Sequence, residues 1–275
     1  MTAPLYTVHL FPILDRKLIA LLRSLNDREW NMPTRAKLWS VKDVAAHLLD
    51  TNIRTLSTSR DTHFGPPPEN INSYTDLVAY LNRLNADWVT AAKRMSPKVL
   101  TDLLDTTGYE YSRHMAQLDP NAQAIFSVAW AGDETSPNWV HIAREYTEKW
   151  HHQQQIREAV GKPGIASHEL YHPVLDTFLR ALPYHYRNVE APVGTTVSVC
   201  ITGVAGGTWT IVRQDKTWSL TTPSPQANAT ITLPDSEAWK LLTKGLTAPE
   251  AEKHITRHGD PGLTSPILTL VAVMA

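Results

Sequence analysis

Hydrophobic residues recur every three or four positions over much of the first 160 residues, which is the spacing of amphipathic helices. A short further helix is expected to start at Ser96, and residues 105–136 are expected to be irregular apart from a short helix over 121–130. The principal helices are predicted over residues 10–26, 40–57, 75–95 and 138–160. Four main helices with a longer third connection predict an antiparallel four-helix bundle.

The pattern changes after Gly164, where runs rich in β-branched residues and tryptophan replace the helical period. Strands are predicted over residues 195–201, 208–213, 217–221 and 229–233. Helices are predicted over residues 168–182, 236–244 and 248–256, with a last one from about 264. Strands followed by helices indicate an α+β domain. We therefore predict an α+β protein with a helical domain over residues 1–163 and a smaller α+β domain over 164–275.

Composition narrows the class of protein. The chain has 275 residues, 42% of them hydrophobic and 19% charged, with a net charge of −1. Such a balance predicts neither nucleic acid nor an acidic membrane surface as a partner, and no apolar run approaches the ~20 residues that span a bilayer. Cys200 is the single cysteine, which favours a reducing compartment. We expect a cytoplasmic protein, monomer or homodimer, that acts on a small molecule.

A polar stripe lies along the predicted helix 138–160. At about 100° per residue, five polar side chains fall within about 40° of one line. They are His141, Glu145, Glu148, His152 and Gln155. Such a stripe is either the wet face of an amphipathic helix or one wall of a buried site. The remaining residues of this helix do not form a clean apolar face opposite the stripe, which keeps the second interpretation open.

Glu148 and His152 have the spacing of a metal chelate. Side chains four residues apart on a helix lie about 6 Å from each other, so a carboxylate oxygen and an imidazole nitrogen can converge on one cation. This pair needs a third ligand, and His47 is the best candidate because it lies at the edge of the apolar arc of the helix 40–57. His151, three residues after Glu148, competes with His152 for the ligand position.

Two segments carry a resemblance to a known family. Residues 38–49, LWSVKDVAAHLL, resemble the second-helix motif of DinB-like bundle enzymes, and residues 144–161, REYTEKWHHQQQIREAVG, resemble the fourth-helix motif of mycothiol-dependent maleylpyruvate isomerases. The ending ITRHGDPGLTSPILTL is similar to the end of the sterol-carrier-like domain of that branch. The resemblance implies His47, Glu148 and His152 as metal ligands and favours His152 over His151.

The same resemblance implies a cofactor and a chemistry. The expected cofactor is a divalent metal, in the first place zinc, with nickel, iron and manganese as alternatives, together with a low-molecular-weight thiol. The metal would activate the thiol for isomerisation or S-transfer on a small electrophile. His141 and Glu145 are candidates for catalytic or supporting roles beside the ligands. Gln155 departs from the family, which commonly has aspartate three residues after the ligand histidine.

Two other functions remain as alternatives at this point. A metal-dependent hydrolase would use metal-bound water, with Glu145 or His141 as the base. A non-enzymatic protein would hold an apolar ligand in its second domain, with a structural metal in the first.

Overall fold

The computed structural model describes residues 3–66, 71–126, 135–224 and 226–272. Within these ranges the chain forms two compact units, each described by itself below. The helical unit consists of residues 6–125 and 145–165, and the sheet unit consists of residues 3–5, 126, 135–144 and 166–272. The domain boundary predicted between residues 163 and 164 stays a prediction.

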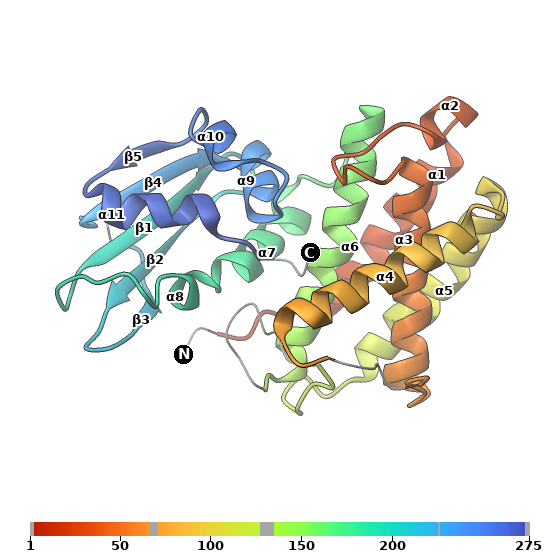
Figure 1. Cartoon of the computed structure of the whole chain (residues 1–275), viewed down its shortest axis with the longest axis horizontal. Helices are drawn as coiled ribbons and strands as arrows, with labels where there is room; N and C mark the ends of the chain where they lie inside the picture. Colours follow the sequence, from red (N-terminus) through yellow and green to blue (C-terminus); the bar gives the residue numbers. More distant parts are fainter. Residues whose placement is uncertain (1–2, 67–70, 127–134, 225, 273–275) are drawn as a thin grey trace. The chain divides into compact units, whose positions relative to one another are not determined.

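Long helices form the helical unit, together with the short helix α2, Asp27–Trp30 (Figure 1). The long ones are α1 (Phe11–Arg23), α3 (Val41–Thr55), α4 (Tyr74–Ala92), α5 (Pro97–Gln117) and α6 (Asn138–Val160). A 3₁₀ turn, Val8–Leu10, precedes α1, and a π-helical turn, Leu56–Arg60, follows α3. Residues 145–160 of α6 belong to this unit, and residues 138–144 belong to the sheet unit.

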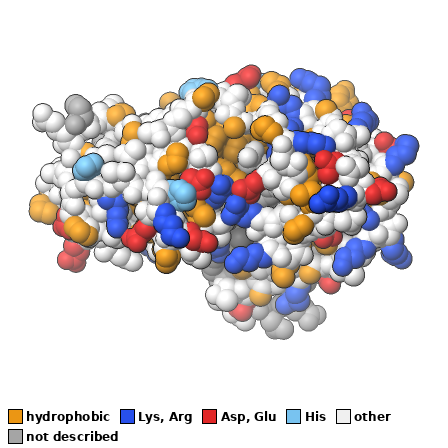
Figure 2. Space-filling model, turned by 90° about the horizontal axis from the view of Figure 1, so that it is seen from above, with side chains coloured by type: hydrophobic (Ala, Val, Ile, Leu, Met, Phe, Trp, Pro, Cys, Tyr) orange, Lys and Arg blue, Asp and Glu red, His pale blue; other side chains and the backbone are white. Residues whose placement is uncertain are grey.

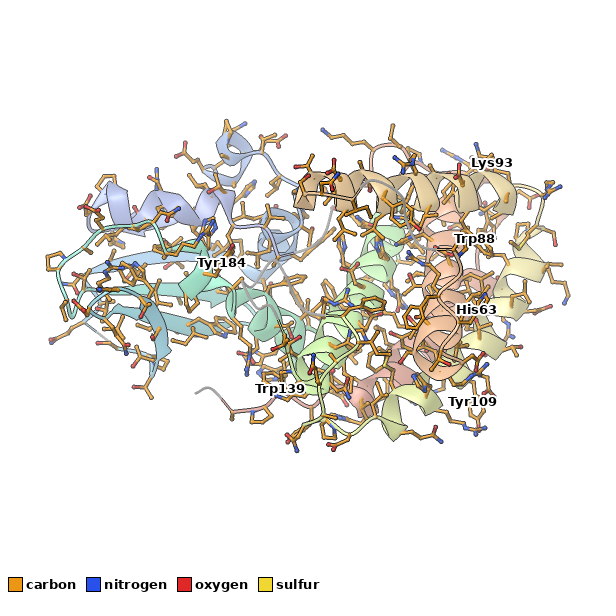
Figure 3. All side chains as sticks on the ribbon, turned by 60° about the horizontal axis from the view of Figure 1, so that its bottom comes forward. His63, Trp88, Lys93, Tyr109, Trp139 and Tyr184 are labelled. Atoms are coloured by element: carbon orange, nitrogen blue, oxygen red, sulfur yellow. The ribbon has the colours of Figure 1, made fainter. Side chains whose placement is uncertain are left out.

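The core of the helical unit joins these helices through the residues that the periodicity places on one face. Leu18 and Leu22 of α1 pack with Val44 of α3, Leu104 of α5 and Ile156 of α6. Trp88 of α4 (Figure 3) ties this helix to α3: its indole N–H donates a hydrogen bond to the carbonyl oxygen of Ala46 at 2.8 Å. The apolar residues whose spacing predicts α1 and α3 therefore form the surfaces through which these helices pack.

The structure corrects the prediction for residues 97–136. The helix α5 is 21 residues long, so the short helix and the irregular stretch predicted for residues 105–117 are wrong. Gly108 lies in the middle of the buried face of α5, against the carboxylate of Asp15. Because glycine has no side chain, it interrupts the apolar pattern from which this helix could be predicted. Residues 121–126 are not helical, which contradicts the start of the helix predicted over 121–130, and residues 127–130 lie outside the described ranges.

The sheet unit contains a five-stranded sheet in the order β3-β2-β1-β4-β5. At its centre, β1 (Thr196–Thr202) is antiparallel to β2 (Gly207–Arg213) and parallel to β4 (Ala229–Pro234). The strands β3 (Trp218–Thr221) and β5 (Thr256–His258) form the edges. Four of these strands match the prediction, and the α+β class is confirmed. The fifth, β5, was missed because its three residues are polar and exposed.

Short helices accompany the sheet, with α8 beside β3 and α9 beside β4 (Figure 1). They are α7 (His168–Leu179), α8 (Leu182–His185), α9 (Asp235–Leu242), α10 (Ala248–Ala251) and α11 (Pro261–Thr264). The closing helix predicted from about residue 264 is wrong over residues 265–272, because α11 ends at Thr264 and a 3₁₀ turn, Ser265–Thr269, follows. Residues 273–275 lie outside the described ranges. The Asp260 carboxylate caps α11 by accepting a hydrogen bond from the Gly262 N–H at 2.8 Å.

Two surface properties bear on partners. No helix among the described residues is long and apolar enough to cross a membrane. On the face drawn in Figure 2, lysine and arginine side chains are interspersed with aspartate and glutamate side chains. This mixture agrees with the net charge of −1.

Candidate metal centre

The polar stripe of α6 is buried in large part. Glu145, His152 and Gln155 are buried and Glu148 is half-buried, so the interpretation of the stripe as a wet helix face is wrong. Burial of polar groups is costly unless they find partners. The stripe therefore has to be explained by what its side chains contact.

Glu148, His151 and His152 form a cluster on α6 whose potential ligand atoms all lie within 4.8 Å of one another. Within it, His152 Nε2 and Glu148 Oε2 are 3.5 Å apart. That distance is long for a charge-assisted hydrogen bond, for which about 2.7–2.9 Å is usual. Two ligand atoms of a tetrahedral zinc ion, each about 2.0–2.2 Å from the metal, are separated by roughly 3.4 Å. The pair thus has the separation of two ligands of one cation.

His47 approaches this cluster from α3. A capping box begins that helix, in which Ser40 and Asp43 each satisfy the other's backbone N–H. The His47 ring lies edge-on to the His152 ring, with 4.7 Å between centroids. His47 does not belong to the group within 4.8 Å, but its side chain is 8% exposed and its buried Nδ1 has no hydrogen-bond partner among the described residues. The lone pair of such a buried ring nitrogen is available to a metal, and a bound cation would satisfy it.

Burial also keeps His47 and His151 in the neutral form that binds metals. It holds the pKa of His47 well below its usual range, and the neighbouring His152 and Arg54 lower the pKa further. Burial likewise holds the pKa of His151 well below its usual range, with His152 acting in the same direction. Both rings are therefore neutral near pH 7, and the neutral imidazole is the ligand.

The Trp39 ring lies close to the rings of His47 and His152, the two histidines that the sequence predicts as metal ligands. Its ring centroid is 4.9 Å from that of His47 and 6.4 Å from that of His152. The loop that carries it is fastened to α6 by Arg35, which makes two hydrogen bonds to the Glu158 carboxylate at 2.6 and 2.8 Å. This ion pair joins residues 123 positions apart, so no local signal in the sequence could reveal it.

Gln155 bridges His151 and His152, two neighbouring histidines of α6. Its Oε1 is 2.9 Å from His152 Nδ1, and its Nε2 is 3.0 Å from His151 Nε2. The residue that departs from the family pattern is thus in direct contact with one predicted ligand and with its competitor.

The two candidates for catalytic or supporting roles lie outside the cluster of Glu148, His151 and His152. The Glu145 Oε2 accepts a hydrogen bond from the Tyr111 hydroxyl of α5 at 2.8 Å. His141 Nδ1 is 3.1 Å from an Arg144 guanidinium nitrogen, and both belong to the other compact unit. The roles predicted for His141 and Glu145 stay predictions.

The donor set fits a divalent cation. A carboxylate oxygen and imidazole nitrogens are ligands that zinc accepts in four-coordinate sites, and they also suit nickel, iron and manganese. The ligand set predicted from the sequence is His47, Glu148 and His152, and the geometry adds His151 as an alternative third ligand. If His151 also binds the cation, the site has four protein ligands, as structural zinc sites do. If it does not, three protein ligands remain, as in catalytic zinc sites.

The buried histidines predict how stability changes with pH. In the unfolded chain they titrate near pH 6.5, whereas burial lowers the pKa of His47 and of His151 in the folded protein. The unfolded state therefore binds protons first as the pH falls, and the free energy of unfolding decreases below about pH 6.5. The pKa of His114 and of His185 is lowered by burial as well, which adds to the same trend.

This expectation is tested by urea unfolding of the metal-free protein at several pH values between about 5 and 7.5. The His47→Ala variant should show a shallower loss of stability, because one of the depressed histidines is gone. The exposed His63 (Figure 3) provides the matched control, and His63→Ala should keep the slope of the wild type. Equal slopes in all three proteins would contradict the assignment to His47.

Comparison with known proteins gives a family and a fold. Residues 11–157, more than half of the chain, match the sequence model of a family described as mycothiol maleylpyruvate isomerase N-terminal domain. A crystal structure of a mycothiol-dependent maleylpyruvate isomerase is similar with a TM-score of 0.53 at 11% identity, over 91% of this chain and 90% of that one. A mutant of that enzyme gives a TM-score of 0.51 at the same identity and coverage. At this identity the structures show a shared fold. No curated protein matches the chain.

Proposed function

Because the chain belongs to the mycothiol maleylpyruvate isomerase N-terminal domain family, as its helix motifs predict, we propose that it is a metal-dependent enzyme that activates a low-molecular-weight thiol. The reaction would be an isomerisation or an S-transfer on a small electrophile. Family membership supports a thiol-dependent isomerase. The metal, the ligand set and the S-transfer alternative are our own additions.

One observation carries the metal part of the proposal. His152 Nε2 and Glu148 Oε2 face each other at 3.5 Å, beside a buried His47 whose Nδ1 has no hydrogen-bond partner among the described residues. The first distance is too long for a strong hydrogen bond, and the second feature leaves a buried polar atom unsatisfied. A cation held by these three side chains would compensate both.

When bound, the cation would stabilise a thiol as its thiolate and so provide a nucleophile near neutral pH. The protein residues then have distinct tasks. His47 and His152 would bind as neutral rings, and the Glu148 carboxylate would lower the net positive charge of the site. Trp39 covers the ring of His47 and would limit the access of water on that side.

The three protein ligands would leave one position for the thiol, which is the arrangement of a catalytic zinc site. If His151 is a fourth ligand instead, the position is closed, and the protein would hold a structural metal. The presence of His151 in the cluster keeps this second candidate function open to test. The hydrolase alternative gains no comparable support. Of its two proposed bases, Glu145 accepts a hydrogen bond from Tyr111, and both Glu145 and His141 lie outside the cluster of Glu148, His151 and His152.

The proposal is tested with protein whose metal has been exchanged for cobalt. Mycothiol, the thiol used by the structurally similar isomerase, is titrated into the cobalt protein, and glutathione serves as the second thiol. Coordination of the thiolate should produce a sulfur-to-cobalt charge-transfer band. The isomerisation of maleylpyruvate is then followed with the zinc protein in the presence and absence of the same thiols.

A charge-transfer band with either thiol, and turnover that depends on that thiol, would support the proposal. Failure of both thiols to produce a band, or turnover at the same rate without any thiol, would overturn it. A metal that binds tightly but gives no band would favour the structural role. The His63→Ala variant should behave as the wild type in each assay, because His63 is exposed and lies outside the cluster.

A further inference from the structure

The amide of Gln155 lies between two imidazole rings that compete for one metal site. Its oxygen is 2.9 Å from His152 Nδ1 and its nitrogen is 3.0 Å from His151 Nε2. All three side chains are buried. Each end of the amide therefore interacts with one ring nitrogen away from bulk water.

The chemistry of an amide determines where the protons are. Its oxygen can only accept hydrogen bonds, so with the amide oriented in this way His152 Nδ1 carries a proton and donates it. In the neutral ring the lone pair is then on Nε2, the atom that faces the Glu148 carboxylate at 3.5 Å. The amide nitrogen can only donate, so His151 Nε2 is the acceptor and the proton of that neutral ring is on Nδ1.

The opposite orientation of the amide fits less well. It would require the lone pair of His152 on Nδ1 and the proton on Nε2. That N–H would then point toward Glu148 Oε2 over 3.5 Å, a distance at which a hydrogen bond is weak. With the lone pair on His152 Nε2, this nitrogen and Glu148 Oε2 can both bind one cation. Their separation is close to the roughly 3.4 Å between two ligand atoms of tetrahedral zinc.

We infer that Gln155 is a positioning residue that selects the metal-binding tautomer of His152 and holds His151 Nε2 away from the metal. This inference rests on the proposed function, because it assumes that the site binds a cation. It assigns the third ligand to His47 and leaves a coordination position for the thiol. A hydrogen bond to the second nitrogen of a ligand histidine orients the ring and raises metal affinity, but here one side chain would act on two histidines with opposite results.

Two substitutions separate the two halves of the inference. Gln155→Leu removes both hydrogen bonds, so His152 should show a mixture of tautomers. Gln155→Glu retains an acceptor for His152 Nδ1 but offers no donor to His151, whose proton should move to Nε2. Both tautomers are measured in the metal-free protein by the ¹⁵N chemical shifts of the imidazole nitrogens, a readout that needs neither metal nor turnover.

Zinc affinity, measured by competition with a chelator, provides the second readout. Gln155→Leu should weaken zinc binding about 10–100-fold, the usual cost of losing a partner behind a ligand. The same substitution at the neighbouring half-buried position, Gln154→Leu, is the matched control and should stay within about threefold of the wild type. His151→Gln, which offers an acceptor to the Gln155 N–H, should also stay within about threefold.

The inference is overturned if Gln155→Leu leaves both the tautomer of His152 and the zinc affinity unchanged. A hundredfold loss of affinity in His151→Gln would overturn its second half, because His151 would then be a ligand. Thermal unfolding of the metal-free variants shows whether each one is folded. If wild-type protein binds no zinc, the proposed function fails, whereas the tautomer measurement still tests the role of Gln155.

Discussion

Replacing His47 by alanine should weaken zinc binding by more than about 100-fold, which is more than the usual cost of losing a side chain that only supports a ligand. The expectation follows from the position of the His47 ring against that of His152, 4.7 Å between centroids, and from its buried nitrogen without a partner among the described residues. With His47 removed, Glu148 and His152 provide two ligands. A two-residue site from one helix should retain little metal during purification.

The measurement is the zinc content of the purified protein together with the shift of its melting temperature on addition of zinc. A ligand that binds the folded state raises the apparent stability, so the shift should be present in the wild type and absent in His47→Ala. His63→Ala tests the loss of an exposed histidine in the same unit, and its zinc content should equal that of the wild type. Unchanged metal content in His47→Ala would assign the third ligand to His151 and remove His47 from the site.

Replacing Asp15 by alanine should destabilise the protein by about 3–5 kcal/mol, the usual cost of leaving a buried charge without its partner. The Asp15 carboxylate accepts two hydrogen bonds from Lys149 Nζ, at 2.9 and 3.2 Å. Lys149 is 5% exposed and its ammonium lies 4.4 Å from the centroid of the Tyr111 ring. The ring provides a favourable contact but cannot replace the negative charge.

Urea unfolding measures the free energy of unfolding of each variant. An exposed ion pair provides the control. Arg23 and Asp105 are 2.8 Å apart, but both side chains are more than half exposed, so Asp105→Ala should cost less than about 1 kcal/mol. The double variant Asp15→Leu with Lys149→Met should recover most of the stability, because an apolar pair can replace a buried ion pair. A loss below about 1 kcal/mol in Asp15→Ala would show that Lys149 reaches water.

The buried ion pair also explains the orientation of α6. Lys149 follows Glu148 directly, so their side chains point about 100° apart around the helix. Lys149 contacts Asp15 of α1 and the Tyr111 ring of α5, whereas His152, one turn beyond Glu148, contacts His47 of α3. The contacts of Lys149 therefore help to hold Glu148 and His152 on the side of α6 that faces α3.

Much of the fold follows from residue pattern alone. The helix α6 has the predicted bounds, and β1 to β4 lie within one residue of the predicted strands, because long helices and β-branched strands carry strong periodic signals. The failures lie where that signal is interrupted or short. Gly108 breaks the apolar stripe of α5, β5 has three exposed residues, and Ser265–Thr269 form a 3₁₀ turn where the sequence predicts a helix.

The sequence by itself determined the spacing of Glu148 and His152, the capping box that begins the helix of His47, and the family, since each depends on residues close together along the chain. Only the tertiary structure decided that the polar stripe is buried, that the His47 ring contacts the His152 ring, and that Gln155 contacts both His151 and His152. The first two depend on contacts between different helices, from the Tyr111–Glu145 pair, 34 positions apart, to His47 and His152, which are far more distant along the chain. The third depends on rotamers that only the packed core restricts. A pattern of residue types specifies which side chains share a face, but the packing of the helices decides what that face contacts.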